Sequence, residues 1–350
     1  MAGVALDVKH RLVPVPGGRI HLVEQGSGPL VLLVHGFPES WYSWRHQLPA
    51  LAAAGYRAVA IDVRGYGRSS KPADVAAYRI VDHVADNVGV VHALGEQQAV
   101  VIGHDWGSPI AANSALLRPD VFSAVALLSV PYTPRGSRRP TDALAELDDG
   151  RGGEFYISYF QAPGRAEAEI EPDVRGWLTG IYAGLSGGTV PRDEIVSMFF
   201  VPPGGRMTDR FPDGTGRPAW MTEADLDFFA GEFERAGLTG PLNRYRNVDQ
   251  DWADLAAWHG APITQPSLFI GGEFDGPSTW QARSIAGFGT TLPGLIGSHI
   301  LDGCGHWVQQ ERPDEVNELL TGWLSALPHR ATLLRQASGQ TSGPAAPSAR

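Results

Sequence analysis

Residues 99–107 read AVVIGHDWG, an apolar run that passes into a stretch with glycine on both sides of an aspartate. The spacing of Gly103, Asp105 and Gly107 is that of a nucleophile elbow, in which a strand turns sharply into a helix. Such an elbow usually carries serine at the central position, whereas this chain carries Asp105. Taken alone, the five residues 103–107 are equally compatible with an ordinary aspartate at a helix N-terminus, where negative charge is favoured.

The segments around this stretch alternate between strand-like and helix-like patterns. Apolar runs of strand length occupy residues 30–34, 58–61, 99–102 and 125–130. Helical stretches separate these runs at about 41–53, at about 80–94 and from Ser108 onward. Short apolar runs that alternate with helices are typical of βαβ units, whose parallel strands are buried on both faces. The sequence therefore predicts an α/β fold with a mostly parallel central sheet flanked by helices.

The strand pattern stops near Pro131. Residues 132–258 show helical patterns, Gly/Pro breaks and aromatic side chains without a strand rhythm. Thr222 and Asp225 form a capping box that opens one helix of this region, and Gly237 follows its end. We therefore expect residues 132–258 to form an inserted helical cap.

Strand-like runs return at 268–270 and 299–301, and a last helix is expected at about 313–326. The core then consists of two halves of one sheet domain, residues 1–131 and 259–328. Residues 329–350 are rich in Ala, Ser, Gly and Pro, a composition typical of a disordered tail.

The composition is that of a globular protein, with 43% hydrophobic and 19% charged residues. A net charge of −10 argues against a nucleic-acid partner, which would require a basic stripe. No apolar run reaches the ~18 residues of a membrane span, and the first residues lack the pattern of a secretory signal. The single cysteine, Cys304, excludes an internal disulfide. We therefore expect a cytoplasmic protein.

Three further features fit a catalytic elbow. HGFP at residues 35–38 follows the 30–34 run, and a loop in that place supplies one backbone N–H to an oxyanion hole. The residue after the nucleophile supplies the other, so the predicted donors are Phe37 and Trp106. Asp275 follows the 268–270 run, and His306 lies in GCGHW after the 299–301 run. Nucleophile, acid and histidine then occur in the chain order that this architecture requires.

Two other candidate nucleophiles fit less well. Residues 184–188, GLSGG, match Gly-x-Ser-x-Gly literally, but no apolar strand precedes Ser186 and Pro191 follows closely. Cys304 shares a turn with His306 and follows no elbow, so a small packed residue is expected there. The eleven histidines form no cluster with metal-ligand spacing, so we do not expect metal-dependent hydrolysis.

A carboxylate at the elbow restricts the chemistry. Its reference pKa of ~3.9 means that Asp105 is ionised at pH 7 without a base, which leaves His306 free for a second step. Attack on an acyl carbon would give an anhydride, which disfavours an esterase. Attack on a saturated carbon gives an alkyl ester of Asp105, and water can hydrolyse that ester while Phe37 and Trp106 hold the oxyanion. The residues therefore favour epoxides or alkyl halides as substrates.

The leaving group separates the two classes. Halide leaves as a stable anion, whereas an epoxide oxygen leaves as a strong base and needs a proton donor, worth ~10²–10⁴ in rate. The cap region offers four candidate tyrosines: Tyr156, Tyr159, Tyr182 and Tyr245. Tyr245 is expected on the inward face of a helix that continues towards Trp252. Packing with a bonded hydroxyl is the alternative role for each tyrosine.

Six motifs in order, HGFPESWYSWR, RGYGRSS, GHDWG, YFQAPGRAEAE, GPLNRYRN and GCGHW, resemble the soluble epoxide hydrolases of the α/β-hydrolase superfamily. The resemblance covers about residues 11–328 and is strongest to bacterial members. It implies the α/β-hydrolase fold with a cap, a small-molecule epoxide and water as partners, and no cofactor. The resemblance is also compatible with a homodimer.

The resemblance also implies roles for single residues. Asp105 is implied as nucleophile, His306 as the base that activates water, and Asp275 as the acid that orients it. Tyr156 and Tyr245 are implied as substrate-binding proton donors. Glu273, two residues before Asp275, is the second candidate for the acid. Arg244 departs from the family pattern, because an aromatic residue often precedes the second tyrosine.

A haloalkane dehalogenase is the alternative, since such enzymes share the elbow aspartate. Their oxyanion loop usually carries an amide side chain where this chain has Phe37. An acid or amide often follows the strand that corresponds to 125–130, and here PYTPRG follows it. A non-catalytic scaffold would need none of Asp105, Asp275 and His306. The sequence therefore favours an epoxide hydrolase.

Overall fold

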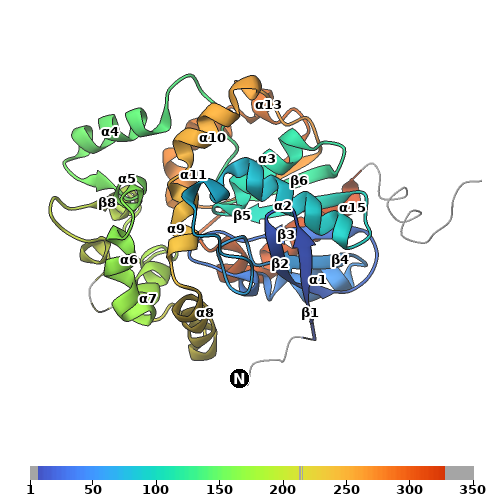
Figure 1. Cartoon of the computed structure of the whole chain (residues 1–350), viewed down its shortest axis with the longest axis horizontal. Coiled ribbons are helices and arrows are strands. Elements are labelled where there is room, and N and C mark those ends of the chain that lie inside the picture. The colour runs from blue at the N-terminus through green and yellow to red at the C-terminus, as the bar shows by residue number, and fades with distance from the viewer. Residues whose placement is uncertain (1–6, 213, 215, 328–350) are drawn as a thin grey trace, which may run out of the picture.

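The computed structural model describes residues 7–327 except 213 and 215, and Figure 1 shows helices around a central sheet with a second group of helices beside it. Within these residues, an eight-stranded sheet runs in the order β1-β2-β4-β3-β5-β6-β9-β10. Its strands are β1 (Lys9–Val15), β2 (Gly18–Gln25), β3 (Leu30–Val34), β4 (Arg57–Ile61), β5 (Ala99–His104), β6 (Phe122–Leu128), β9 (Ser267–Gly272) and β10 (Leu295–Leu301).

Parallel pairing joins the strands from β4 to β10, whereas β1 and β2 pair antiparallel with each other and β2 with β4. Every residue of β3, β5 and β9 is buried, as expected for strands covered on both faces. The predicted mostly parallel sheet is confirmed. The two N-terminal strands escaped prediction because β1, with the sequence KHRLVPV, is largely exposed and carries no buried apolar run.

The two faces of the sheet pack against different helices. Val31 and Leu33 of β3 belong to one hydrophobic cluster, and Leu32 and Val34 belong to another, because successive strand side chains point to opposite faces. The first cluster includes side chains of α1 (Gln47–Ala53), α14 (Val308–Glu311) and α15 (Pro313–Ala326). The second includes side chains of α2 (Ile80–Ala93) and α3 (Gly107–Leu117).

The residues between β6 and β9 supply a further group of helices, which Figure 1 draws in green through yellow to orange. They are α4 (Pro140–Arg151), α5 (Tyr156–Gln161), α6 (Arg165–Ile170), α7 (Val174–Gly184), α8 (Glu223–Ala236), α9 (Thr239–Tyr245) and α10 (Val248–Asp254). We refer to residues 132–258 as the cap, whose bounds stay a prediction. The cap also holds a small antiparallel pair, β7 (Glu154–Phe155) with β8 (Phe200–Val201), which the sequence pattern did not indicate.

The remaining short elements connect these parts. The 3-10 helices are η1 (Trp41–Trp44), η2 (Val75–Tyr78), η3 (Glu171–Asp173), η4 (Ile195–Phe199), η5 (Met207–Arg210) and η6 (Ala256–Trp258). The helices α11 (Gly276–Trp280), α12 (Ala282–Ala286) and α13 (Phe288–Thr291) lie between β9 and β10. No helix in residues 7–327 is both long and apolar enough to cross a membrane. The predicted tail at 329–350 lies outside the described residues.

Three expected boundaries were wrong. The stretch at 41–53 is split into η1 and α1, and Pro49 lies in the first turn of α1, where its missing N–H is tolerated. The helix expected to continue from Tyr245 towards Trp252 is divided into two helices, because α9 ends at Tyr245 and α10 begins at Val248. Asn247 holds the break before α10 by donating to the carbonyls of Val75 and Asn243. β6 ends at Leu128 because Ser129 takes a left-handed conformation with φ of 68°.

The capping box was predicted correctly. The Thr222 hydroxyl accepts from the Asp225 N–H, the Asp225 carboxylate accepts from the Thr222 N–H, and Gly237 follows the last residue of α8.

Candidate active site

Asp105 lies at the turn between β5 and α3, at the carboxyl edge of the sheet. Its φ of 50° is in the left-handed region, which is uncommon for a residue with a side chain and marks a sharp turn. The turn requires glycine on both sides. A Cβ at Gly103 would lie 1.9 Å from the Gly107 carbonyl oxygen, and one at Gly107 would lie 2.0 Å from the Val34 carbonyl oxygen. The Gly-x-Asp-x-Gly spacing therefore has the steric basis expected of an elbow.

The loop after β3 reaches the same carboxylate. The Phe37 N–H donates to Asp105 Oδ1 at 2.7 Å, which is one of the two predicted oxyanion contacts. A Cβ at Gly36 would lie 2.2 Å from that oxygen, so only glycine fits there. Among the described residues, no hydrogen bond joins the Trp106 N–H to Asp105, and its donor role stays a prediction.

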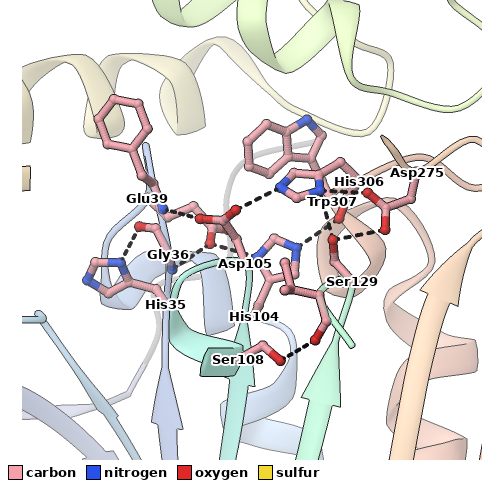
Figure 2. Close-up of polar contacts among 12 residues, drawn as sticks. His35, Gly36, Glu39, His104, Asp105, Ser108, Ser129, Asp275, His306 and Trp307 are labelled. Carbon is pink, nitrogen blue, oxygen red and sulfur yellow. Dashed lines mark hydrogen bonds and ion pairs between the residues drawn. The ribbon is translucent and has the colours of Figure 1, made fainter. Parts of the chain in front are cut away.

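His306 lies on the other side of Asp105, in the loop after β10. Its Nε2 is 3.5 Å from Asp105 Oδ2, and its Nδ1 is 2.8 Å from Asp275 Oδ1 (Figure 2). The His306 N–H donates to the Leu185 carbonyl of the cap at 2.8 Å, which fixes the loop that carries the ring. Asp105 is 9% exposed, whereas His306 is 3% exposed and Asp275 is fully buried. Thus the structure brings the three predicted residues into one chain of contacts.

Two serines complete the surroundings of Asp275. Its Oδ2 accepts from the Ser129 hydroxyl at 3.0 Å and from the Ser278 hydroxyl at 2.6 Å. The Ser129 hydroxyl also lies 2.8 Å from His306 Nδ1 (Figure 2). The sequence analysis missed Ser129, because it considered only acids and amides after the run 125–130. The serine hydroxyl within this run could have indicated a hydrogen-bond partner for the histidine.

The two carboxylates determine the charge of the histidine. Burial lowers the pKa of His306, but hydrogen bonds and negative charge from Asp105 and Asp275 outweigh burial and raise that pKa to about 10. The ring is therefore protonated at neutral pH. A change that neutralised Asp105 would remove part of this stabilisation and lower the pKa of His306.

A second buried pair, Glu39 with His104, lies beneath these residues. Glu39 Oε2 accepts from the Gly36 N–H at 3.0 Å and from His104 Nδ1 at 2.8 Å, and His104 Nε2 donates to the His306 carbonyl at 2.8 Å (Figure 2). The pair therefore links the oxyanion loop, the elbow and the histidine loop. Sequence reasoning missed both residues, although both belong to the quoted motifs.

The four candidate tyrosines fall into two groups. The Tyr159 hydroxyl donates to Glu169 Oε2 at 2.6 Å, and the Tyr182 hydroxyl donates to the Pro38 carbonyl at 2.6 Å. Tyr156 and Tyr245 instead line a cavity together with Asp105 and His306, and their ring centroids are 5.9 Å apart. Burial first, and then the Asp105 charge, raise the pKa of both hydroxyls, which keeps them protonated at neutral pH.

The rest of this cavity is apolar. Its walls include the side chains of Phe37, Pro38, Phe160, Trp177, Ile181, Leu185, Met198, Phe199, Met207 and Pro277. Most of these residues come from the cap, so the cap shapes the space into which the Asp105 carboxylate points. An apolar wall with a few convergent polar groups is the usual character of a small-molecule site.

The other candidates have structural partners. Glu273 pairs with Arg192 and accepts from the Gly303 N–H, away from His306. The Ser186 hydroxyl donates to the Tyr182 carbonyl and accepts from the Trp220 indole, so it holds a cap loop. Cys304 is buried, and burial raises the pKa of its thiol, as for a packed residue.

Comparisons with known proteins agree with this arrangement. A family model described as alpha/beta hydrolase fold matches residues 29–313. "Epoxide hydrolase B" of Mycobacterium tuberculosis is 46% identical over 351 residues, which cover 91% of this chain and 98% of the relative. "Epoxide hydrolase" of Caballeronia sordidicola is 40% identical and covers 91% of this chain and 94% of its own.

Solved structures give the same result. An "Epoxide hydrolase from an endophytic Streptomyces" is 73% identical, covers 91% of this chain and 95% of its own, and has a TM-score of 0.89. Epoxide hydrolase A from Mycobacterium thermoresistibile is 42% identical and has a TM-score of 0.84, and the match covers 91% of this chain and 99% of that chain. With a family model matched over most of its length and these identities, the chain belongs to the α/β hydrolase fold family and, within it, to the epoxide hydrolases.

Proposed function

We propose that the protein converts an epoxide and water to a vicinal diol through an alkyl ester of Asp105. The observation that carries this proposal is the placement of the Asp105 carboxylate between the Phe37 N–H and His306, facing two tyrosine hydroxyls across an apolar cavity. A carboxylate nucleophile explains why the elbow lacks serine, because an alkyl ester can be hydrolysed whereas the ether formed by serine could not.

In the first step, Asp105 Oδ2 attacks a ring carbon of the epoxide. Oδ1 accepts from the Phe37 N–H at 2.7 Å, whereas Oδ2 has only the longer 3.5 Å contact with His306 Nε2, so Oδ2 is the oxygen that attacks. The C–O bond of the ring breaks as the new ester bond forms. Tyr156 or Tyr245 gives its proton to the leaving oxygen, so that no alkoxide accumulates.

In the second step, His306 removes a proton from water, and the resulting hydroxide attacks Cγ of the ester. The negative charge that develops on Oδ1 is stabilised by the Phe37 N–H and by the predicted Trp106 N–H. The ester bond then breaks as the protonated His306 gives its proton to the departing diol oxygen. The new carboxyl group of Asp105 gives its proton to the tyrosinate left by the first step, so the diol leaves and the Asp105 carboxylate is restored. Asp275 holds the ring of His306 through Nδ1 and balances its positive charge.

The ester itself prepares His306 for this step. Ester formation converts Asp105 from an anion to a neutral group, which removes one of the two carboxylates that raise the pKa of the ring. With its pKa lowered, the ring releases its resting proton to solvent and becomes a base only after the first step is complete, and it is protonated again when the Asp105 carboxylate is restored. His306 therefore does not remove a proton from water before the ester has formed.

The names of the relatives support the substrate class, since four different proteins named epoxide hydrolase match this chain over about nine tenths of its length. A haloalkane dehalogenase would use the same first step with halide as the leaving group. It would have no need of two tyrosines beside Asp105.

The test is product analysis on styrene oxide, 1,2-epoxyhexane and matched 1-haloalkanes, with Asp105→Ala as the control. We expect diol from the epoxides, no halide release, and loss of diol formation in the variant by at least about 10⁴-fold. His306→Gln should gain the mass of one substrate on Asp105 in intact-protein mass spectrometry. Halide release without diol would establish the dehalogenase alternative.

A further inference from the structure

A second cavity lies where the chain enters and leaves the cap, and we call it the hinge cavity. Its walls come from α3 of the core, from residues 132–140 and from the segment 244–258. It encloses about 300 Å³, which is at the lower end of the range of small-molecule pockets, ~300–1,000 Å³. Neither Asp105 nor His306 lines it, and it shares no lining residue with the cavity that holds both. A third cavity, lined by Asp105 and Tyr156, borders the hinge cavity at Trp106 and Pro109.

The inner part of the hinge cavity is apolar. Ile80 and Leu255 are buried in its wall, and the Trp106 side chain also lines it. At the rim, Trp258 keeps 37% of its surface exposed and is one of four large apolar residues exposed in the described chain. A large apolar side chain at the rim of an apolar cavity is a feature of surfaces that receive a ligand.

Four charged residues line this cavity: Arg135, Arg138, Arg244 and Asp251. Arg244 and Asp251 are buried and paired with each other, and Arg244 also donates to the Tyr78 carbonyl. Arg138 pairs with Glu146. Within the described residues, no carboxylate lies at ion-pair distance from Arg135. The hinge cavity therefore holds one guanidinium that lacks an anionic partner.

Arg135 is already fixed in position. Its Nε donates to the Trp252 carbonyl at 3.1 Å, and its guanidinium carbon lies 4.1 Å from the centroid of the Trp252 ring. Its Nη1 lies 3.2 Å from His259 Nδ1. Because the planar guanidinium of Arg135 is oriented before any ligand arrives, binding of an anion costs little side-chain conformational entropy.

We propose that the hinge cavity is a second small-molecule site that takes an amphipathic monocarboxylate. The carboxylate binds Arg135, and the apolar tail lies against Trp106 and Leu255. One unpaired guanidinium matches one negative charge, and the apolar inner wall matches a hydrocarbon tail. An occupant would also touch Trp106, the residue that follows the proposed nucleophile and over whose ring Arg244 lies at 4.8 Å.

The test uses octanoate as the probe and octanol as its neutral counterpart, with binding to the full chain measured by calorimetry. We expect Arg135→Gln to weaken octanoate binding by about 5- to 10-fold, as for a half-buried charge-assisted hydrogen bond, and to leave octanol binding unchanged. The matched control is Arg118→Gln at the end of α3, where Arg118 pairs with Asp120 and does not line the hinge cavity. It should leave both probes unaffected.

A second variant, Val248→Trp, places bulk in the wall of the hinge cavity and should weaken both probes. Arg135→Lys keeps the charge without the fork and should bind octanoate with intermediate affinity. The proposal is overturned if octanoate fails to bind, or if it binds Arg135→Gln and Val248→Trp as tightly as the unaltered chain. No epoxide is present in these measurements, so their outcome is independent of whether diol formation is observed.

Discussion

His306 Nε2 lies 3.5 Å from Asp105 Oδ2, so the proposed base and nucleophile share a contact before any substrate is present. With the second carboxylate, Asp275, on Nδ1, this contact raises the pKa of the ring to about 10. The resting protein therefore holds an imidazolium between the side chains of Asp105 and Asp275.

This charge makes stability depend on pH in one direction. A group whose pKa is raised on folding stabilises the folded state fully below its unfolded pKa of ~6.5, and that contribution is lost as pH rises towards the folded value. We expect the free energy of unfolding to fall between pH 6.5 and about 10, measured by urea unfolding. The decline should be smaller in His306→Gln. An equal decline in both proteins would contradict the assigned charge.

Tyr156→Phe and Tyr245→Phe together should lower kcat for epoxide opening by about 10²–10⁴, because both hydroxyls facing Asp105 are removed. The matched control is Tyr159→Phe, whose hydroxyl is bonded to Glu169 outside this cavity, and it should retain activity. Steady-state rates of diol formation decide the matter. Unchanged rates in the double variant would show that a residue other than Tyr156 and Tyr245 donates the proton.

Ser129→Ala should lower kcat by about tenfold with little change in KM, because the hydroxyl fixes Asp275 and the ring of His306 without reaching the cavity. Alanine and serine bear the same strain at the positive φ of this residue, so the substitution isolates the hydroxyl. Ser123→Ala, on the strand that precedes Ser129, is the control. A raised KM with unchanged kcat would show that Ser129 acts on substrate binding.

Glu39→Gln should destabilise the fold by on the order of 3 kcal/mol, because it removes one partner of the buried pair with His104. Burial raises the pKa of Glu39, but the charge and hydrogen bond of His104 outweigh it and lower the pKa to about 2. The contribution is therefore present above pH 4.5 and lost as pH falls towards 2.

Urea unfolding at pH 3, 5 and 7 tests this. The difference between Glu39→Gln and the unaltered chain should be largest at pH 7 and smallest at pH 3. Glu315→Gln, at an exposed pair with Arg312, should change stability little at any pH.

The parallel part of the sheet was predictable because its strands are continuous apolar runs, such as residues 30–34, between helices. The elbow was predictable because the turn admits only glycine at Gly103 and Gly107. Both are local signals. The antiparallel strand β1 was missed because its residues alternate in exposure and its pairing partner is set by the hairpin with β2.

The residues that support the site were harder to predict, since their roles depend on contacts distant in sequence. Glu39 and His104 are 65 positions apart, and Ser129 and His306 are 177 apart. No motif or spacing in a single sequence indicates that these residues are in contact. The choice among the tyrosines followed from resemblance alone, whereas the structure distinguishes them by which ones line the cavity with Asp105.

The carboxylate, the oxyanion loop, the acid and the base all belong to the sheet core, whereas Tyr245, Tyr156 and most of the apolar wall belong to the cap. Under the proposed function, the residues for ester hydrolysis lie in the core and most residues that contact the substrate lie in the cap, so separate stretches of the gene encode them. Mutations in the codons for the apolar cap residues of the cavity wall can therefore alter which molecule is accepted while the proposed nucleophile, acid and base stay the same. In evolutionary terms, this apolar wall is free to diverge, whereas Tyr156, Tyr245 and the Leu185 carbonyl that holds the His306 loop are tied to the chemistry.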